Sequence, residues 1–587
     1  MKRLLTVEGE KLQKSLEFSE NNSFIPHNEY PRPTLFRNSY LNLNGIWKFG
    51  IVEKNNQAIK EPVYDKEILV PFPIESILSG IEKHYSDGTE LHYSRDFYIE
   101  KEFINKKIIL NIGAIDQCST VYINGSEVGY HIGGYSSFSF DITDFISVGK
   151  NNIHICCVDN LNSLILPYGK QREKRGGMWY TPVSGIWQTV WIESVPENYI
   201  KKVDFETEKN IVSVKINDGL NGKGMIETKN GNVEFSITDG CGKAKINNPE
   251  YWSPENPYLY NVTIKTDCDE IKSYFAFRTL EIKSINGINR LCLNGKPYFF
   301  HGLLDQGYWS DGIYTPASDK AFIDDIMFAK KMGFNMLRKH IKTEPERFYY
   351  YCDKLGIVVF QDMINNSDYS FFRDTFLPTI GVKNRSDKNL HKNSTTRKVF
   401  TESSERIVND LKKHPSICLW TIFNEGWGQF SGNIMYEFIK SLDDTRFIDT
   451  ASGWFTCSES DVESIHTYFK KYKHKKSNKP VFLSEFGGYS FKLKEHSFNT
   501  KKTYGYGKFS SESDFTKAVE NLYYNEIIPS IPLGLCATVY TQLSDVEDET
   551  NGFITYDRKV AKISSDNMKE ISEKIFEANE KLINTNS

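Results

Sequence analysis

The chain has 587 residues, of which 39% are hydrophobic and 25% charged, a balance typical of proteins that fold around buried cores. This length predicts several domains. The formal net charge of -4 and the pI of about 6.4 provide no excess of positive charge to attract nucleic acid or an anionic membrane. We therefore expect neither as a partner.

The N-terminal sequence, Met1–Ser15, lacks the long apolar stretch of a signal peptide, and no later run is long enough to span a bilayer. The ten cysteines stand at scattered spacings without a C-x-x-C pair. This pattern predicts neither a zinc site nor a disulfide framework. We expect a cytoplasmic protein that needs no metal and no cofactor.

The first half of the chain is predicted to be β structure. From about residue 30 to 200, short β-branched runs such as Lys107–Ile112 and Ser119–Ile123 are punctuated by turn residues such as Asn124-Gly125. From about 200 to 282, alternating segments such as Val212–Ile216 and Tyr260–Lys265 continue. Several short strands in so few residues indicate a small antiparallel sandwich.

From about residue 283, apolar strand-like runs alternate with amphipathic stretches. Helices are predicted over Asp319–Met332 and Glu344–Leu355. Strands are predicted at Phe334–Arg338, Ile357–Phe360, Ile417–Phe423, Arg446–Thr450, Val462–His466, Pro480–Ser484 and Leu535–Tyr540. This alternation over roughly 300 residues favours one (β/α)₈ barrel. A doubly wound sheet is the alternative, but no G-x-G-x-x-G turn opens a helix near its first strand.

Two carboxylates follow apolar strands directly. One strand leads into Asn424-Glu425-Gly426, and another ends at Ser484-Glu485, followed by Phe486 and Gly487. The carboxyl ends of barrel strands surround the active site, and an isolated charge there is costly unless it has a role. The two glutamates are therefore candidate catalytic residues, with a pair of structural salt bridges as the alternative.

A pair of carboxylates is what retaining glycoside hydrolysis needs. One must be protonated to assist the leaving oxygen, while the other must be ionised to attack the anomeric carbon. Retention requires the two groups to lie about 5–5.5 Å apart, and a larger gap implies inversion. The sequence leaves that distance open.

Ordered motifs along most of the chain resemble glycoside hydrolase family 2, the family of β-galactosidases, β-glucuronidases and β-mannosidases. They are Pro31-Arg32-Pro33, Leu43–Phe49, Asp116 with Val121–Gly125, Gly185–Gln188, Tyr251–Tyr260, Phe277–Thr279, Gly333–Arg338, Asn424-Glu425 and Ser484–Gly487. The resemblance implies a jelly-roll sugar-binding domain over 1–198, an immunoglobulin-like sandwich over 199–282 and a catalytic (β/α)₈ barrel over 283–587.

The resemblance also implies roles for single residues. Glu425 matches the family's acid/base and Glu485 its nucleophile. Asn424 is similar to the residue that hydrogen-bonds the sugar 2-hydroxyl, and Tyr468 to one that hydrogen-bonds the nucleophile. Arg338 is similar to a residue that keeps the nucleophile ionised, although it could instead simply neutralise the barrel floor.

Departures from the family pattern bear on the sugar. The strand-eight tryptophan that floors the sugar site in such enzymes corresponds to Tyr540, and the Asn-x-Lys motif that binds a uronic acid in β-glucuronidases has no lysine in Asn551–Arg558. A uronic acid is therefore disfavoured, although Lys339 or Lys342 could supply a cation. Further candidate sugar contacts at the barrel mouth are Asp305, Gln306, Trp309, Asp362, Trp427, Trp454, His466, Gln542 and Asp545.

We therefore expect a retaining exo-β-glycosidase that cleaves terminal β-linked sugars from oligosaccharides or glycosides. A β-galactosidase is the leading expectation, because that activity is frequent in such a family. A β-glucuronidase or another β-glycosidase of the family is the alternative, and a homo-oligomer is possible. From other classes, the rivals are an inactive carbohydrate-binding protein and a structural multidomain protein whose barrel is only a scaffold.

Overall fold

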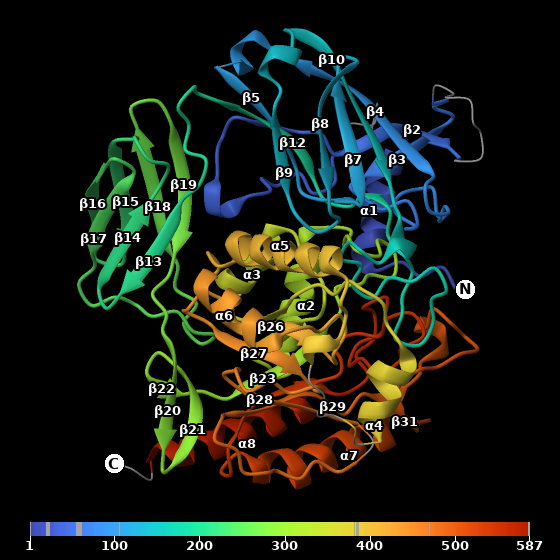
Figure 1. Ribbon diagram of the computed structural model, residues 1–587, viewed down its shortest axis with the longest axis vertical. Helices are drawn as coiled ribbons and strands as arrows, with labels where there is room; N and C mark the ends of the chain where they lie inside the picture. The colour runs from blue at the N-terminus through green and yellow to red at the C-terminus, as the bar shows by residue number, and fades with distance from the viewer. Residues whose placement is uncertain are drawn as a thin grey trace.

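The computed structural model describes residues 2–18, 24–53, 62–104, 106–380, 382, 387–468 and 470–584. In Figure 1 a β domain built from the first part of the chain lies above an α/β barrel, and a second β domain lies beside them on the left. A helix, α1 (Val7–Phe18), precedes the first β domain. The predicted order of domain types, two of β structure and then a barrel, is confirmed.

The N-terminal domain is a sandwich of two antiparallel sheets. One sheet has the strand order β1-β12-β5-β9 and the other the order β3-β2-β4-β10-β7-β8. Their strands are β1 (Tyr40–Asn42), β2 (Gly45–Val52), β3 (Lys66–Val70), β4 (Glu90–Ile99), β5 (Lys107–Ile112), β7 (Cys118–Ile123), β8 (Ser126–Ile132), β9 (Phe138–Asp141), β10 (Gly149–Val158) and β12 (Val190–Val195). Alternate side chains, such as Ile153, Ile155 and Cys157 on β10, point into one shared core.

The second β domain is a seven-stranded antiparallel sheet in the order β13-β14-β17-β16-β15-β18-β19. Its strands are β13 (Asp204–Glu208), β14 (Ile211–Lys215), β15 (Gly222–Thr228), β16 (Gly231–Thr238), β17 (Cys241–Lys245), β18 (Tyr260–Thr266) and β19 (Glu270–Phe275). Strict alternation of buried and exposed residues, as in β18, leaves one face of each strand in water and gathers the other into a separate core.

The barrel is an eight-stranded sheet in the order β27-β26-β25-β24-β23-β32-β29-β28, and each pairing within that order is parallel. The end strands β27 and β28 lie against each other. The strands are β23 (Phe300–Asp305), β24 (Met336–Lys339), β25 (Val358–Asp362), β26 (Ile417–Asn424), β27 (Phe447–Ser452), β28 (Glu463–Thr467), β29 (Val481–Phe486) and β32 (Leu535–Tyr540). The predicted barrel is confirmed, and the seven strands predicted from the sequence correspond to all of its strands except β23.

Helices that follow the barrel strands pack around the sheet. They are α2 (Asp319–Lys331), α3 (Glu346–Leu355), α5 (Ser394–Leu411), α6 (Gly432–Leu442), α7 (Glu512–Leu522) and α8 (Ser565–Asn584), with the short α4 (Leu377–Thr379) between β25 and β26. α3 ends at Gly356, whose positive φ of 73° allows the left-handed turn that closes many helices. None of the described helices is long and apolar enough to cross a membrane.

The second β domain contributes to the floor of the barrel. Trp252, from the segment after β17, is fully buried and its indole Nε1 donates to the Asp353 carbonyl of α3 at 2.8 Å. It shares an apolar core with Phe300, Met336 and Val358 of the barrel strands. The hairpin β20 (Leu280–Ile285) and β21 (Ile288–Leu293) joins the same core. The barrel core is therefore completed by residues from outside it.

A loop of the N-terminal domain, residues 164–184, reaches the opposite end of the barrel. The Tyr168 hydroxyl donates to the Ser367 carbonyl at 2.8 Å, and the Thr181 amide donates to Glu547 at 2.8 Å. Both partners lie in loops that follow barrel strands, after β25 and β32 respectively. The 164–184 loop therefore crosses the end of the barrel at which the strands have their carboxyl ends.

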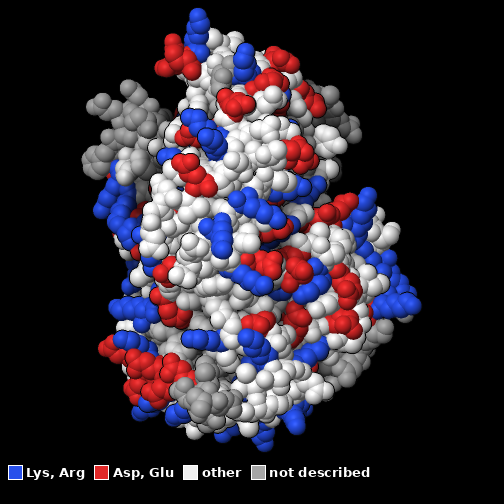
Figure 2. All heavy atoms as spheres, turned by 90° about the vertical axis from the view of Figure 1, so that its left-hand side faces the viewer, with Lys and Arg blue, Asp and Glu red and all other residues white. Residues whose placement is uncertain are grey.

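Charges of both signs are interspersed over most of the face that includes the second β domain (Figure 2). This distribution agrees with the small net charge of the whole chain.

Candidate active site

Glu425 and Glu485 lie at the carboxyl ends of β26 and β29. Glu425 has a left-handed backbone, with φ of 52°, and is followed by Gly426 at 75°, so the chain turns sharply just where the strand ends. Their side chains are 14% and 6% exposed. One oxygen of each carboxylate and a ring nitrogen of His466 lie within 4.8 Å of one another. The two carboxylates therefore face each other.

His466, at the end of β28, stands between the two glutamates. Its Nδ1 lies 2.9 Å from Glu425 Oε1 and 3.5 Å from Glu485 Oε2. Its other nitrogen, Nε2, lies 3.0 Å from the Ser452 hydroxyl of β27. The sequence suggested that His466 contacts the sugar. The structure places its imidazole ring where it orients the carboxylates of Glu425 and Glu485.

Arg338, on β24, is fully buried and links three site residues. Its Nη1 donates to Glu485 Oε1 at 3.2 Å, and its Nη2 donates to Asn424 Oδ1 at 3.0 Å. Its Nε and Nη2 also donate to the two oxygens of Asp362 at 3.0 and 3.1 Å. A planar guanidinium with donors in a fixed fork suits this arrangement.

Asp362 therefore supports Arg338, and its contact with a sugar stays a prediction. Besides its two bonds to Arg338, its Oδ2 lies 2.8 Å from His340 Nδ1. Asn424 is different. Its oxygen accepts from Arg338, and its Nδ2 group has no partner among the described residues. That amide is available to bind a substrate hydroxyl.

The surroundings of Glu485 favour its ionised form. Burial alone would raise its pKa, but the rings of His466 and His340 in their protonated forms, the guanidinium of Arg338 and the hydrogen bond from Tyr468 lower the pKa to about 2. Burial lowers the pKa of His340 to about 4, so this ring is neutral near pH 7. Arg338 is the cation that stays charged at every relevant pH, and Glu485 is ionised at neutral pH.

Tyr468 donates its hydroxyl proton to Glu485 Oε2, as the resemblance implied. The same hydroxyl lies 3.0 Å from the Thr541 hydroxyl, directly after β32. The sequence did not indicate Thr541, because a threonine after an apolar strand has no distinctive pattern. Instead it suggested Tyr540 as the floor of the site. The structure buries Tyr540 in the core, where it stacks on Phe553 with ring centres 4.3 Å apart.

Several predicted sugar contacts form a second hydrogen-bonded group between β23 and the loop after β32. Gln306 Nε2 donates to Gln542 Oε1 at 2.7 Å, and Gln542 Nε2 donates to Asn551 at 3.1 Å. Lys339 donates to Asp305 at 2.6 Å, and Lys562 donates to Asp545 at 2.6 Å. None of these bonds is to either glutamate. Trp309 is buried apart from them, under the guanidinium of Arg558.

The two predicted cations for a sugar carboxylate are already neutralised. Lys339 donates to Asp305 and, at 2.8 Å, to Glu344. Lys342 donates to both oxygens of Glu344 at 2.9 Å and to the carbonyls of Gly307 and Tyr314. Lys342 has enough acceptors to use all three of its N–H donors, whereas Lys339 keeps one donor but has its charge compensated by two carboxylates. A role for either lysine in binding a sugar carboxylate stays a prediction, and these contacts do not favour it.

Aromatic side chains from two domains meet beside Glu425. Trp427 stacks on Trp179 of the 164–184 loop, with ring centres 5.2 Å apart, and Lys170 of the same loop lies over the Trp427 ring at 5.6 Å. The Trp427 indole nitrogen has no partner among the described residues. Trp454 packs against His466 with ring centres 5.7 Å apart. The sequence indicated Trp427 and Trp454 but not Trp179 or Lys170, which stand about 250 residues earlier in the chain.

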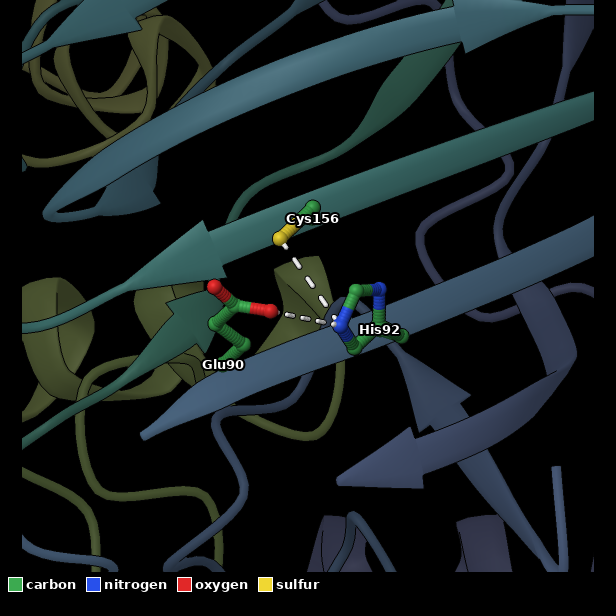
Figure 3. A group of neighbouring side chains, drawn as sticks. All are labelled: Glu90, His92 and Cys156. Atoms are coloured by element: carbon green, nitrogen blue, oxygen red, sulfur yellow. Dashed lines mark hydrogen bonds and ion pairs between the residues drawn. The ribbon is translucent and has the colours of Figure 1, made fainter. Parts of the chain in front are cut away.

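Two groups of described side chains have the donors to hold a metal ion. One is Glu425, His466 and Glu485 itself. In the other, shown in Figure 3, His92 Nε2 lies 3.3 Å from Glu90 Oε2 on β4 and 3.9 Å from Cys156 Sγ on β10. Burial raises the pKa of the Cys156 thiol to about 12. This group lies on the N-terminal sandwich, on the sheet face that points away from its core, and we assign it no part in chemistry at the barrel.

A (β/α)₈ barrel with two carboxylates facing each other at its strand ends is an arrangement typical of glycoside hydrolases. Three family models match consecutive parts of the chain: the sugar-binding domain of glycosyl hydrolases family 2 at residues 52–196, a second family 2 domain at 192–278, and the family 2 TIM barrel domain at 284–500. The chain belongs to glycoside hydrolase family 2, a family of retaining enzymes.

Curated relatives carry two kinds of name. A putative β-glucuronidase of Formosa agariphila is 26% identical over 514 residues, covering 76% of this chain and 57% of the relative. A β-galactosidase of Thermoanaerobacter pseudethanolicus is 24% identical over 459 residues, covering 73% of this chain and 56% of the relative. The chain thus spans about half the length of these relatives.

Solved structures match the fold along nearly the whole chain. A β-D-glucuronidase from Dictyoglomus thermophilum has a TM-score of 0.70 and 20% identity, covering 93% of this chain and 98% of the other. A Bifidobacterium dentium β-glucuronidase in complex with coumarin-3-O-glucuronide has a TM-score of 0.71 and 17% identity, with the same coverage. A β-galacturonidase from Eisenbergiella tayi has a TM-score of 0.65 and 18% identity, covering 94% and 98%. At these identities the likeness shows the fold.

Proposed function

We propose that the protein is a retaining exo-β-glycosidase in which Glu485 is the nucleophile and Glu425 the acid/base. The observation that carries this proposal is the approach of the two carboxylates, with one oxygen of each within 4.8 Å. That approach suits the spacing of about 5–5.5 Å in retaining enzymes, because an inverting enzyme needs room for a water between them. The contacts of Arg338 and Tyr468 support the choice of Glu485 as the ionised partner.

In the first step, Glu485 attacks the anomeric carbon while Glu425 gives its proton to the glycosidic oxygen. The bond to the aglycone breaks, and a glycosyl ester forms on Glu485. In the second step, Glu425 takes a proton from water, which attacks the same carbon and releases Glu485 as a carboxylate. The Asn424 amide, which has no protein partner, is placed to bind a sugar hydroxyl beside these groups.

Among sugars, we favour a β-linked hexuronic acid over the β-galactoside expected from the sequence. The solved structures named above are two β-glucuronidases and a β-galacturonidase, and the curated relatives divide between β-glucuronidases and β-galactosidases.

The test uses nitrophenyl β-glycosides with the wild type, Glu485→Gly and Glu425→Ala. Glu485→Gly should abolish hydrolysis, and azide or formate should partly restore it by filling the space of the carboxylate. Glu425→Ala should retain far more activity on substrates with good leaving groups than on those with poor ones, because only the latter need a proton. A Glu485→Gly enzyme as active as wild type, or equal losses for both leaving groups in Glu425→Ala, would contradict the assignments.

The alternative hypothesis, a carbohydrate-binding protein without activity, makes the opposite prediction. Under it, the pure wild-type protein cleaves no β-glycoside at all but still binds sugar.

A further inference from the structure

Recognition of a sugar carboxylate needs a cation that is not already neutralised, and most basic residues near the barrel mouth fail this requirement. Arg338 is held by Asp362 and Glu485, and Lys339 and Lys342 are both held by Glu344. Lys562 is bound to Asp545. In each case a second carboxylate would gain little, because the charge is already compensated.

Lys170, in the 164–184 loop, is the exception. It is only 7% exposed, and its ammonium group makes no hydrogen bond or ion pair with any residue that the structure describes. Its contacts are the faces of two aromatic rings, Tyr180 at 5.7 Å and Trp427 at 5.6 Å. Aromatic faces stabilise a cation by far less than the burial of an ion costs. Among the described residues, Lys170 has no partner of opposite charge within ion-pair distance.

Lys170 lies within electrostatic range of the catalytic end of the barrel. Its ring contact, Trp427, is two residues after Glu425. Its charge also lowers the pKa of His340, which follows β24, and it opposes the burial that raises the pKa of Glu549 in the loop after β32. Glu549 in turn feels the charge of Glu485. Residues around Lys170 therefore come from three barrel loops that also surround the two glutamates.

Glu549 is the nearest alternative partner for this charge. Its carboxylate is bound by the Asn551 amide at 3.4 Å, and it is not within ion-pair distance of Lys170. Burial raises the pKa of Glu549, and the charge of Lys170 opposes this rise without cancelling it. An ammonium that is buried, held by aromatic rings and left without an anion is ready to bind one from a ligand.

We propose that Lys170 binds the carboxylate of a terminal β-linked hexuronic acid, so that the N-terminal domain supplies the cation that determines the sugar. This inference rests on the proposed glycosidase function. The proposal requires that a sugar whose anomeric carbon lies between Glu425 and Glu485 directs its carboxylate toward the 164–184 loop, past Trp427, the ring that Lys170 contacts. The cation replaces, from another domain, the lysine that is missing from Asn551–Arg558.

The test compares nitrophenyl β-D-glucuronide and β-D-galacturonide with the neutral β-D-glucoside and β-D-galactoside. The enzymes are the wild type, Lys170→Met, Lys170→Arg and, as a matched control, Lys174→Met, which removes an exposed lysine of the same loop. The wild type should prefer a uronide. Lys170→Met should lower kcat/KM for that uronide about 100-fold, as expected for loss of a charge-assisted bond, with less than threefold change for neutral sugars. Lys170→Arg should retain part of the preference, and Lys174→Met all of it.

A wild type that cleaves neutral glycosides but neither uronide would overturn this inference and leave the proposed function intact. The inference would also be overturned if Lys170→Met lowered kcat/KM equally for charged and neutral sugars. A wild type that cleaves none of the four would instead contradict the proposed function itself.

Stability gives a second readout that does not depend on activity. Without ligand, Lys170→Met should unfold at a higher temperature than wild type, because it replaces a buried ion that lacks a counter-ion by an apolar chain of similar length. A lower unfolding temperature would show that Lys170 serves the fold, and would count against the inference.

Discussion

Arg338 illustrates how one side chain can serve both the fold and the chemistry. Its five hydrogen bonds join β24 to Asp362 on β25, Asn424 on β26 and two groups on β29. The same charge helps to lower the pKa of Glu485 to about 2. A carboxyl group whose folded pKa lies below its ordinary value stabilises the fold above that ordinary value, and loses this contribution as the pH falls toward 2.

Arg338→Met should therefore raise the pKa of Glu485, since burial would act with less opposition. A nucleophile must be ionised, so the acidic limb of the profile of kcat/KM against pH should move to higher pH in the variant. We also expect a loss of about 3–5 kcal/mol in stability, because Asp362 is left buried without its main counter-ion. The measurement is a pH profile on a substrate with a good leaving group, together with thermal unfolding.

Arg290→Met is the matched control. Arg290 is also buried but donates to the carbonyls of Ile531, Pro532 and Leu535, remote from the two glutamates. It should destabilise the protein without moving the acidic limb. If the acidic limb of the pH profile of Arg338→Met stays at its wild-type pH, Arg338 does not help to keep Glu485 ionised.

At the scale of the element, β26 is anchored on its outer side. Trp420, fully buried on this strand, donates its indole Nε1 to Asp443 Oδ2 at 2.9 Å, at the residue that ends α6. The strand that ends in Asn424 and Glu425 is thus held to the helix that follows it. Precise placement of a catalytic pair depends on such rigid supports.

Trp420→Ala should lower stability by about 3–5 kcal/mol, the usual cost of removing a buried tryptophan. Trp420→Phe keeps most of the ring and should lose only about 1 kcal/mol with the hydrogen bond. Calorimetric unfolding of the two variants and the wild type measures both effects. If Trp420→Ala unfolds at the wild-type temperature, the strand does not depend on this anchor.

The barrel strands and the two glutamates could be predicted from the sequence because each has a recognisable local pattern. A buried parallel strand is a short apolar run, and Glu425 and Glu485 each stand directly after one. Pairing between side chains leaves no such pattern. Asp362 and Asp305 look alike in sequence, yet one is bound to Arg338 and the other to Lys339. Likewise, nothing in the sequence brings Lys170 to the barrel mouth, or Glu344 to Lys339 and Lys342.

At the scale of the whole molecule, the barrel is supported at both ends by other domains. Trp252 of the second β domain packs into the barrel floor, and the 164–184 loop of the N-terminal domain contacts the loops at the catalytic end. Interfaces of this kind couple the stability of the barrel to residues outside it.

Trp252→Ala should therefore lower the temperature at which hydrolysis is lost, with a cost of about 3–5 kcal/mol, although the residue is far from the catalytic end. Tyr251→Phe is the control, since it removes only a hydroxyl that donates to the Lys209 carbonyl within the second β domain. Inactivation by heat, followed with a nitrophenyl glycoside, measures the effect. Equal inactivation temperatures for Trp252→Ala and the control would show that the barrel floor is independent of the second domain.

The reach of the 164–184 loop has a consequence for how such an enzyme can diverge. Under our proposal, bond cleavage depends on residues of the barrel strands, whereas the loop lies between strands of a different domain and interrupts no β/α unit. Duplicated copies of the gene could therefore acquire new sugar preferences through changes in this one segment, at positions that do not hold it to the barrel. A laboratory library confined to the loop would explore the same route, while every member inherited an intact catalytic pair.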